Sequence, residues 1–132
     1  MKFTIFTQAI LAVPVLSTAL APPVIDTSEV KRENCQLTLQ WKSNWNESGL
    51  KRYRVQLITS PRNDKHLDLY CSQFSKNKAQ LNNVACFWID GMYVIDSSHA
   101  VGPAGYAAYK REHGYASKAF TTGTGCTVIQ NL

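Results

Sequence analysis

Four cysteines, Cys35, Cys71, Cys86 and Cys126, are the residues of this 132-residue chain best suited to covalent chemistry. An even cysteine number is typical of disulfides in small exported chains, and four cysteines allow three pairings. Fourteen residues separate Cys71 from Cys86, which lie in neighbouring strand-like runs, so we favour this pair. Cys35 and Cys126 would then join the ends of the domain. The alternative is a bridge from Cys35 to a second subunit, which would make a dimer.

Metal binding by the cysteines is not expected, because no Cys-x-x-Cys or Cys/His spacing accompanies them. A second candidate for chemistry is Glu112-His113, which follows Lys110-Arg111. A ribonuclease-like enzyme could use the carboxylate and imidazole as acid and base, with the cations holding phosphate. Successive residues of one strand or turn point in different directions, so we favour a solvated turn. We assign no catalytic residue and no cofactor.

A third candidate is a basic and aromatic cluster near Trp45, Arg52 and Arg54. Cations interleaved with aromatic residues can bind single-stranded nucleic acid or anionic polysaccharide. We favour instead an outward strand face, with Tyr53 and Val55 packed inside, and we expect no nucleic-acid partner. Trp45 lies among turn-forming residues, so we expect it to be the most exposed of these aromatic residues and to anchor a partner.

The N-terminus indicates export. Residues 1–21 have the positive start, apolar run and small residues of a secretion signal, with cleavage after Ala21 or after Ala19. Residues 22–32 read as a pro-segment that ends in the dibasic pair Lys31-Arg32. Removal of both leaves residues 33–132 as one domain, with eleven Lys and Arg against seven Asp and Glu. We expect a secreted protein with no membrane span.

Asn46-Glu47-Ser48 is an N-glycosylation sequon in a polar stretch rich in turn formers. Secretion would bring this stretch into the compartment where such sequons are glycosylated. Asn46 is therefore a candidate glycosylation site.

Hydrophobic residues after Cys35 mostly alternate with polar ones, the pattern of half-buried strands. This alternation covers residues 37–41, 53–57 and 67–71, and a last strand is expected over 124–129. Asp90-Gly91 between two aromatic and β-branched runs predicts a two-residue hairpin turn. The expected fold is mainly β, a small antiparallel β-sandwich or barrel stapled by two disulfides.

The segment near 103–113 fits two structures. Pro103 could begin a short helix that ends at Gly114, and the alanines between them favour helix. The alternative is a hairpin of residues 106–110 and 115–120. Because Gly102 and Gly105 suit a helix poorly, we favour the hairpin.

The run Leu67-Asp68-Leu69-Tyr70-Cys71-Ser72 and the fourteen residues before Cys86 resemble the major Alternaria allergen family of small secreted fungal β-barrel proteins. The resemblance extends over most of residues 35–126. It implies extracellular action on or near a host, as a defence elicitor or effector. It also implies that an early cysteine comparable to Cys35 can bridge two subunits. The chain departs from the family in being shorter and in having no cysteine after Cys126.

These observations favour a secreted fungal effector- or elicitor-like protein that binds a host extracellular protein and contributes to virulence, and entry into host cells stays open. A ribonuclease-like enzyme around Glu112 and His113 is one alternative. An antimicrobial or killer-toxin-like protein that uses its positive charge is another.

Overall fold

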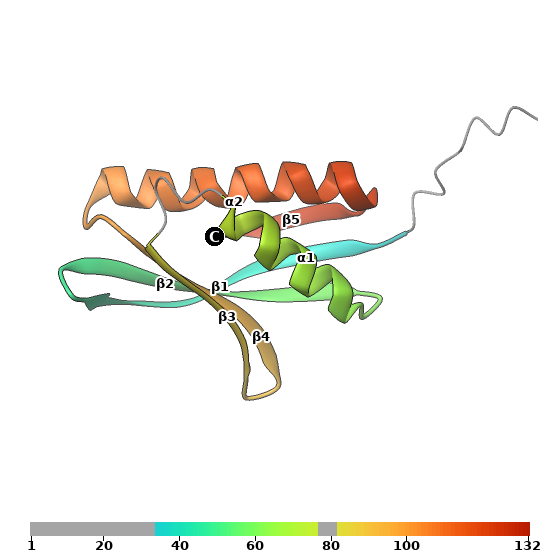
Figure 1. Cartoon of the computed structure of the whole chain (residues 1–132), viewed down its shortest axis with the longest axis horizontal. Helices are drawn as coiled ribbons and strands as arrows, with labels where there is room; N and C mark the ends of the chain where they lie inside the picture. The colour runs from blue at the N-terminus through green and yellow to red at the C-terminus, as the bar shows by residue number, and fades with distance from the viewer. Residues whose placement is uncertain (1–33, 77–81) are drawn as a thin grey trace, which may run out of the picture.

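One open five-stranded sheet carries two helices in the computed structural model, which describes residues 34–76 and 82–132 (Figure 1). The elements in chain order are β1 (Gln36–Glu47), β2 (Leu50–Ser60), α1 (Asp64–Ser75), β3 (Asn82–Ile89), β4 (Met92–His99), α2 (Pro103–Thr124) and β5 (Thr127–Asn131). The strand order is β3-β4-β2-β1-β5; β1 and β5 are parallel, and the other pairs are antiparallel. The processing site Lys31-Arg32 lies outside the described residues.

The predicted mainly β domain with two disulfides is confirmed, but the sheet neither closes into a barrel nor packs on a second sheet. A layer of helices takes the place of a second sheet. Both helices cover the same sheet face, and Tyr70 of α1 contacts His113 of α2 across their interface. Alternate residues of β1 and β2 fill the core beneath this layer: Leu37, Leu39, Tyr53, Val55 and Leu57.

Both hairpin turns use two residues with positive φ. Asp90 and Gly91 have φ of 49° and 74°, which confirms the predicted β3–β4 turn. Ser48 and Gly49, with φ of 52° and 78°, make a similar turn between β1 and β2. The turn-forming residues Asn44–Asn46, expected to be a loop, therefore extend β1, since a two-residue turn keeps the strands paired up to their ends.

The expected strand over residues 67–71 is wrong, because these residues lie in α1. The Asn63 side chain caps the helix by accepting a hydrogen bond from the His66 backbone N–H at 3.2 Å. The buried residues Leu67, Tyr70 and Phe74 follow the helical spacing, while Leu69 is exposed. The alternation of Leu67, Leu69 and Cys71 was thus misleading.

The favoured hairpin over residues 106–120 is also wrong, because α2 runs through the whole segment and beyond the expected end at Gly114. Pro103 lies in the first helical turn, and Gly125 ends the helix in the left-handed conformation, its N–H bonded to the Thr121 carbonyl at 2.8 Å. Gly105 is required, since a Cβ there would lie 1.6 Å from the carbonyl oxygen of Ala100. The strand expected over 124–129 begins later, at Thr127.

The two favoured disulfides, Cys71–Cys86 and Cys35–Cys126, are both formed. The first ties α1 to β3, and the second ties the start of β1 to the residue before β5. By the chain-entropy estimate, the 15-residue separation contributes about 3 kcal/mol and the 91-residue separation about 4–5 kcal/mol. Use of Cys35 within the chain argues against a dimer linked through this residue.

Candidate functional site

Glu112 and His113 are buried on the inner face of α2, with 2% and 0% of their surface exposed. Lys110 and Arg111 lie on the exposed side of the same helix, because successive helical residues point about 100° apart. The solvated turn expected here is therefore wrong. The four residues do not converge on a common point in solvent, so this segment offers no site for RNA phosphate.

His113 is held by hydrogen bonding and ring packing in the core. Its Nδ1 lies 2.8 Å from the Tyr70 hydroxyl, and its ring packs 4.3 Å from the Phe74 ring. Burial, with His99 nearby, lowers the pKa of His113 to about 3, and burial lowers the pKa of His99 to about 4. Both imidazoles are therefore neutral at physiological pH, and both lie in the core between the sheet and the helices.

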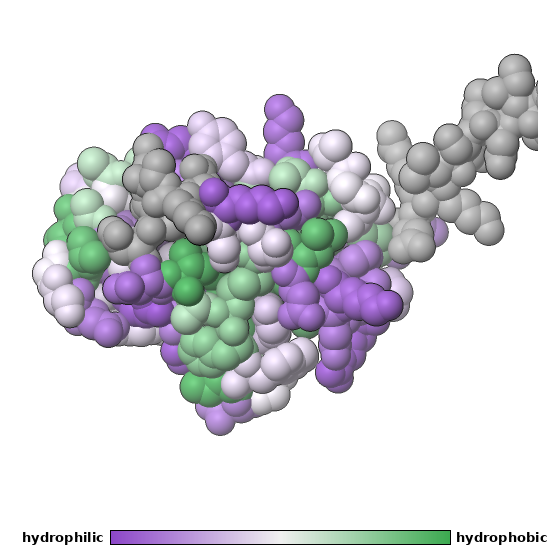
Figure 2. All heavy atoms as spheres, in the orientation of Figure 1, coloured by the Kyte–Doolittle hydropathy of each residue, from purple (hydrophilic) through white to green (hydrophobic). Residues whose placement is uncertain are grey.

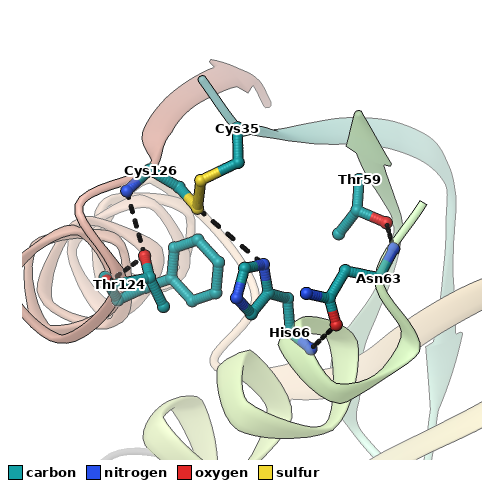
Figure 3. Close-up of a disulfide and its surroundings, with 7 residues drawn as sticks. Cys35, Thr59, Asn63, His66, Thr124 and Cys126 are labelled. Carbon is teal, nitrogen blue, oxygen red and sulfur yellow. Dashed lines mark hydrogen bonds between the residues drawn. A yellow bond between two sulfur atoms is a disulfide. The ribbon is translucent and has the colours of Figure 1, made fainter. Parts of the chain in front are cut away.

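His66 lies beside the Cys35–Cys126 disulfide (Figure 3). Its Nδ1 is 3.8 Å from the Cys126 sulfur, and its ring packs edge-on against Phe120 at 5.4 Å. The two sulfurs and the imidazole lie within 4.8 Å of one another. Cysteine binds metals as thiolate, and these sulfurs are bonded to each other, so the oxidised protein has no metal centre here.

Trp45, Arg52 and Arg54 come together on the sheet face opposite the helices, with Asp96 among them; we call these four residues the sheet-face cluster. Register places Arg52 opposite Trp45, and Arg54 opposite Asp96. The guanidinium of Arg54 donates to both Asp96 carboxylate oxygens, at 2.8 and 2.7 Å. These hydrogen bonds raise the pKa of Arg54 above its ordinary value.

The polar groups of the sheet-face cluster are hydrogen-bonded to one another and to neighbouring residues. Arg52 donates to the Ser98 hydroxyl at 2.9 Å and to the Asn83 carbonyl at 2.8 Å. Arg54 lies over the Trp45 ring at 5.3 Å, and the Trp45 N–H donates to Glu47 at 3.0 Å. Because Asp96 and Glu47 offset the arginine charges, the cluster has little positive charge left to attract nucleic acid.

Trp45 is half-buried, so the expectation that it is the most exposed aromatic residue of this region is wrong. Trp41, with 42% of its surface exposed, lines a groove on the other side of the same strand. The groove measures about 500 Å³ and is lined by residues of β1, β2, α2 and β5. We call it the aromatic groove; its lining residues are Gln40, Trp41, Asn44, Lys51, Tyr53, Tyr106, Asn131 and Leu132.

A β-bulge in β1 builds one wall of the aromatic groove. Trp41 pairs with Val55 and Asn44 pairs with Tyr53, although the odd spacing from 41 to 44 would place them on opposite faces of a regular strand. The extra residue between the two pairs restores both side chains to the helix-side face. Alternation in the sequence therefore could not have identified the groove.

The polar groups of the aromatic groove are largely unengaged. Among the residues that the structure describes, the side chains of Trp41, Asn44 and Lys51 make no hydrogen bond or ion pair. Asn131 donates to the Gln40 side-chain carbonyl at 3.3 Å and thereby links β5 to β1. The groove thus presents an exposed indole, free amide groups and a cation to solvent.

Asn46, the glycosylation candidate, is exposed near the end of β1 and pairs with Lys51. Both residues lie on the sheet face that bears the aromatic groove. A glycan on Asn46 would therefore emerge beside the Lys51 end of the groove.

A third surface is the tip of the β3–β4 hairpin, which projects from the sheet in Figure 1 and bears hydrophobic residues in Figure 2. Trp88 is 49% exposed, the largest exposed fraction of the three tryptophans. With Ile58, which is 42% exposed, it lines a shallow depression of about 180 Å³. We call Trp88 and Gly91 of this hairpin, together with the neighbouring Ile58 of β2, the hairpin tip.

A scan of protein-family models, a search of curated proteins and a search of solved structures each found no match to this chain. No helix in residues 34–76 and 82–132 is long and apolar enough to cross a membrane.

Proposed function

We propose that the mature chain is a secreted effector- or elicitor-like binding protein that acts on a host extracellular protein. Two disulfides are compatible with an oxidising extracellular environment. The resemblance to the Alternaria allergen family is the source of the host and virulence part of this proposal. The observation that carries the binding part is the projecting, hydrophobic hairpin tip.

The hairpin tip has the chemistry of a protein contact. Tryptophan is one of the residue types enriched in interface hot spots. The Trp88 ring lies 5.4 Å from the ring of Tyr93, which packs against it from the core side. The Arg62 guanidinium lies 5.3 Å from the Trp88 ring, on the rim of the same depression. An aromatic centre with a charged rim is the usual anatomy of a protein–protein interface.

Capture from plant extracellular fluid tests the proposal. The secreted, oxidised protein is immobilised beside a reduced and alkylated sample, and retained proteins are compared. We expect a host protein on the oxidised sample alone, because loss of both disulfides removes much of the stability of so small a domain. Equal retention by the two samples, or none, would contradict host-protein binding.

A variant pair then locates the contact. Trp88→Ala should reduce capture about tenfold, as expected for an interface anchor. Tyr115→Ala is the matched control, since Tyr115 is 57% exposed on α2, and it should capture normally. Full capture by Trp88→Ala would exclude the hairpin tip as the contact surface.

A further inference from the structure

We infer that the aromatic groove is a binding site for a neutral oligosaccharide. This site is separate from the hairpin tip and does not depend on the proposed function. Its volume of about 500 Å³ lies within the range of small-molecule sites, about 300–1,000 Å³.

Exposed aromatic rings suit sugars because one face of a pyranose ring presents C–H groups with partial positive charge. These groups pack on the negative face of an aromatic ring. Trp41 is 42% exposed and Tyr106 is 43% exposed, and both line the groove. Trp41 makes no ring contact within the described chain, so its faces are available for stacking.

The amide groups suit sugar hydroxyls. A side-chain amide carries an acceptor and two donors in one plane, and adjacent hydroxyls of a sugar offer the complementary pair. Asn44 is unengaged, and Gln40 and Asn131 keep spare capacity beyond their mutual 3.3 Å hydrogen bond. An apolar ligand would bury these amides without hydrogen-bond partners, which disfavours its binding.

The charge of the groove favours a neutral sugar. Lys51 is the one charged side chain among its lining residues, so no paired cations are present to hold a phosphate or a run of carboxylates. The strands on its floor are paired with each other from Trp41–Val55 to Glu47–Leu50, but β5 pairs with the other edge of β1 only as far as Gln40. A peptide that added to this outer edge would bind through its backbone. Binding of an extended peptide, with none of the sugars bound, is the outcome that would favour that occupant.

The tyrosine side of the groove is preorganised. Tyr53, on its floor, stacks on the buried ring of Tyr109 at a centroid distance of 4.1 Å. Tyr106 packs 6.0 Å from the same Tyr109 ring, and the Lys110 ammonium lies 5.0 Å from the Tyr106 ring centroid. Strand pairing fixes the backbone of Trp41 and Asn44. A ligand therefore orders the side chains of Trp41 and Asn44 but not the tyrosines, which limits the entropic cost of binding.

The test uses the full chain, secreted in its oxidised form with Asn46→Gln so that no glycan can emerge beside the groove. The probes are β-1,3-glucan, β-1,4-glucan and chitin hexasaccharides, followed through the indole N–H signals of the three tryptophans. We expect a saturable shift of the Trp41 signal with at least one probe. The Trp88 signal should stay unchanged, because it lies outside the groove.

Matched variants make the test specific. Trp41→Ala should weaken binding about tenfold, and Trp41→Phe should retain part of the affinity because it keeps a stacking face. Asn44→Ala should weaken binding several-fold, whereas Trp88→Ala should bind normally. Thermal unfolding of each variant shows that it is folded, and the exposure of Trp41 makes misfolding of its variants unexpected.

Two results would overturn the inference. One is the absence of any Trp41 shift with all three probes at millimolar concentration. The other is binding of acidic oligogalacturonate alone, with affinity lost at high salt, which would make Lys51 the principal contact. Because host-protein capture is tested through Trp88, either proposal can fail while the other stands.

Discussion

The sheet-face cluster and the aromatic groove have similar compositions, a tryptophan of β1 beside cations of β2, but they use their polar groups in opposite ways. In the cluster, Arg54 and Asp96 are bonded at 2.7 and 2.8 Å, and Trp45 donates to Glu47. In the groove, Trp41 and Lys51 have no such partners among the described residues. Groups bonded to each other stabilise the fold, whereas groups left open can bind a ligand.

Among single substitutions, the largest effect should come from removing the carboxylate at the centre of the sheet-face cluster. Asp96→Ala leaves two arginine side chains, 11% and 23% exposed, without their shared partner. We expect a loss of about 2–3 kcal/mol in the free energy of unfolding, below the full cost for a buried pair because both arginines reach solvent. Urea denaturation measures the change.

The exposed pair Arg62–Asp64 is the matched control, with a similar two-bond geometry at 2.9 and 3.2 Å. Asp64→Asn should shift the urea midpoint far less than Asp96→Ala, because solvent screens an exposed pair. Equal shifts would show that burial does not distinguish the cluster from an ordinary surface ion pair.

Local sequence patterns predicted several features of the fold but not the bulge or the groove. The buried Tyr53, Val55 and Leu57 of β2, the Asp90-Gly91 turn and both disulfides were predictable. The bulge after Trp41 was not, because one extra residue leaves no mark in the composition. The groove also collects residues from β1, β2, α2 and β5, which only the fold brings together.

Helix α1 was missed, and the helix considered near 103–113 was not favoured, for a related reason. The sequence from Leu67 to Phe74 fits both a two-residue and a helical period, and tertiary burial of Tyr70 and Phe74 decides between them. Gly105 argued against helix α2, yet its missing Cβ is what lets the helix pass the Ala100 carbonyl. A residue that disfavours a helix locally is thus required by packing.

A second prediction concerns acid, which should affect the core beneath both regions. Burial lowers the pKa of His99 and His113 to about 4 and about 3, whereas both titrate near 6.5 in the unfolded chain. The unfolded chain therefore binds more protons, and stability falls as the pH drops below about 6.5. At pH 5 we expect a loss of about 2 kcal/mol for each histidine, measured by urea denaturation at pH 7 and pH 5.

His113→Gln separates this effect from general acid denaturation. The variant should be less stable than the parent at pH 7, because Tyr70 and Phe74 lose their packed imidazole. Its further loss between pH 7 and pH 5 should be about half that of the parent, since His99 alone remains to titrate. An unchanged pH dependence would show that His113 does not carry this acid sensitivity.

The smallest and most direct comparison is between the two tryptophans of β1. Trp45→Ala removes a hydrogen bond to Glu47 and a cation–π contact with Arg54, and we expect a loss of about 1–2 kcal/mol in the free energy of unfolding. Trp41→Ala should change stability by less than about 0.5 kcal/mol, because its exposed ring makes no such contact within the described chain. Urea denaturation of both variants measures the difference.

The two tryptophan substitutions should have the opposite ranking when oligosaccharide binding is measured instead of stability. Trp45→Ala should leave oligosaccharide binding unchanged, because its side chain lies on the sheet face opposite the groove. Trp41→Ala should lose binding while it keeps stability. Equal destabilisation by the two variants would mean that Trp41 serves the fold, and the polar groups around it would then be ordinary solvated surface. A stable Trp41→Ala protein that no longer binds sugar would instead identify the aromatic groove as the surface left open for a ligand.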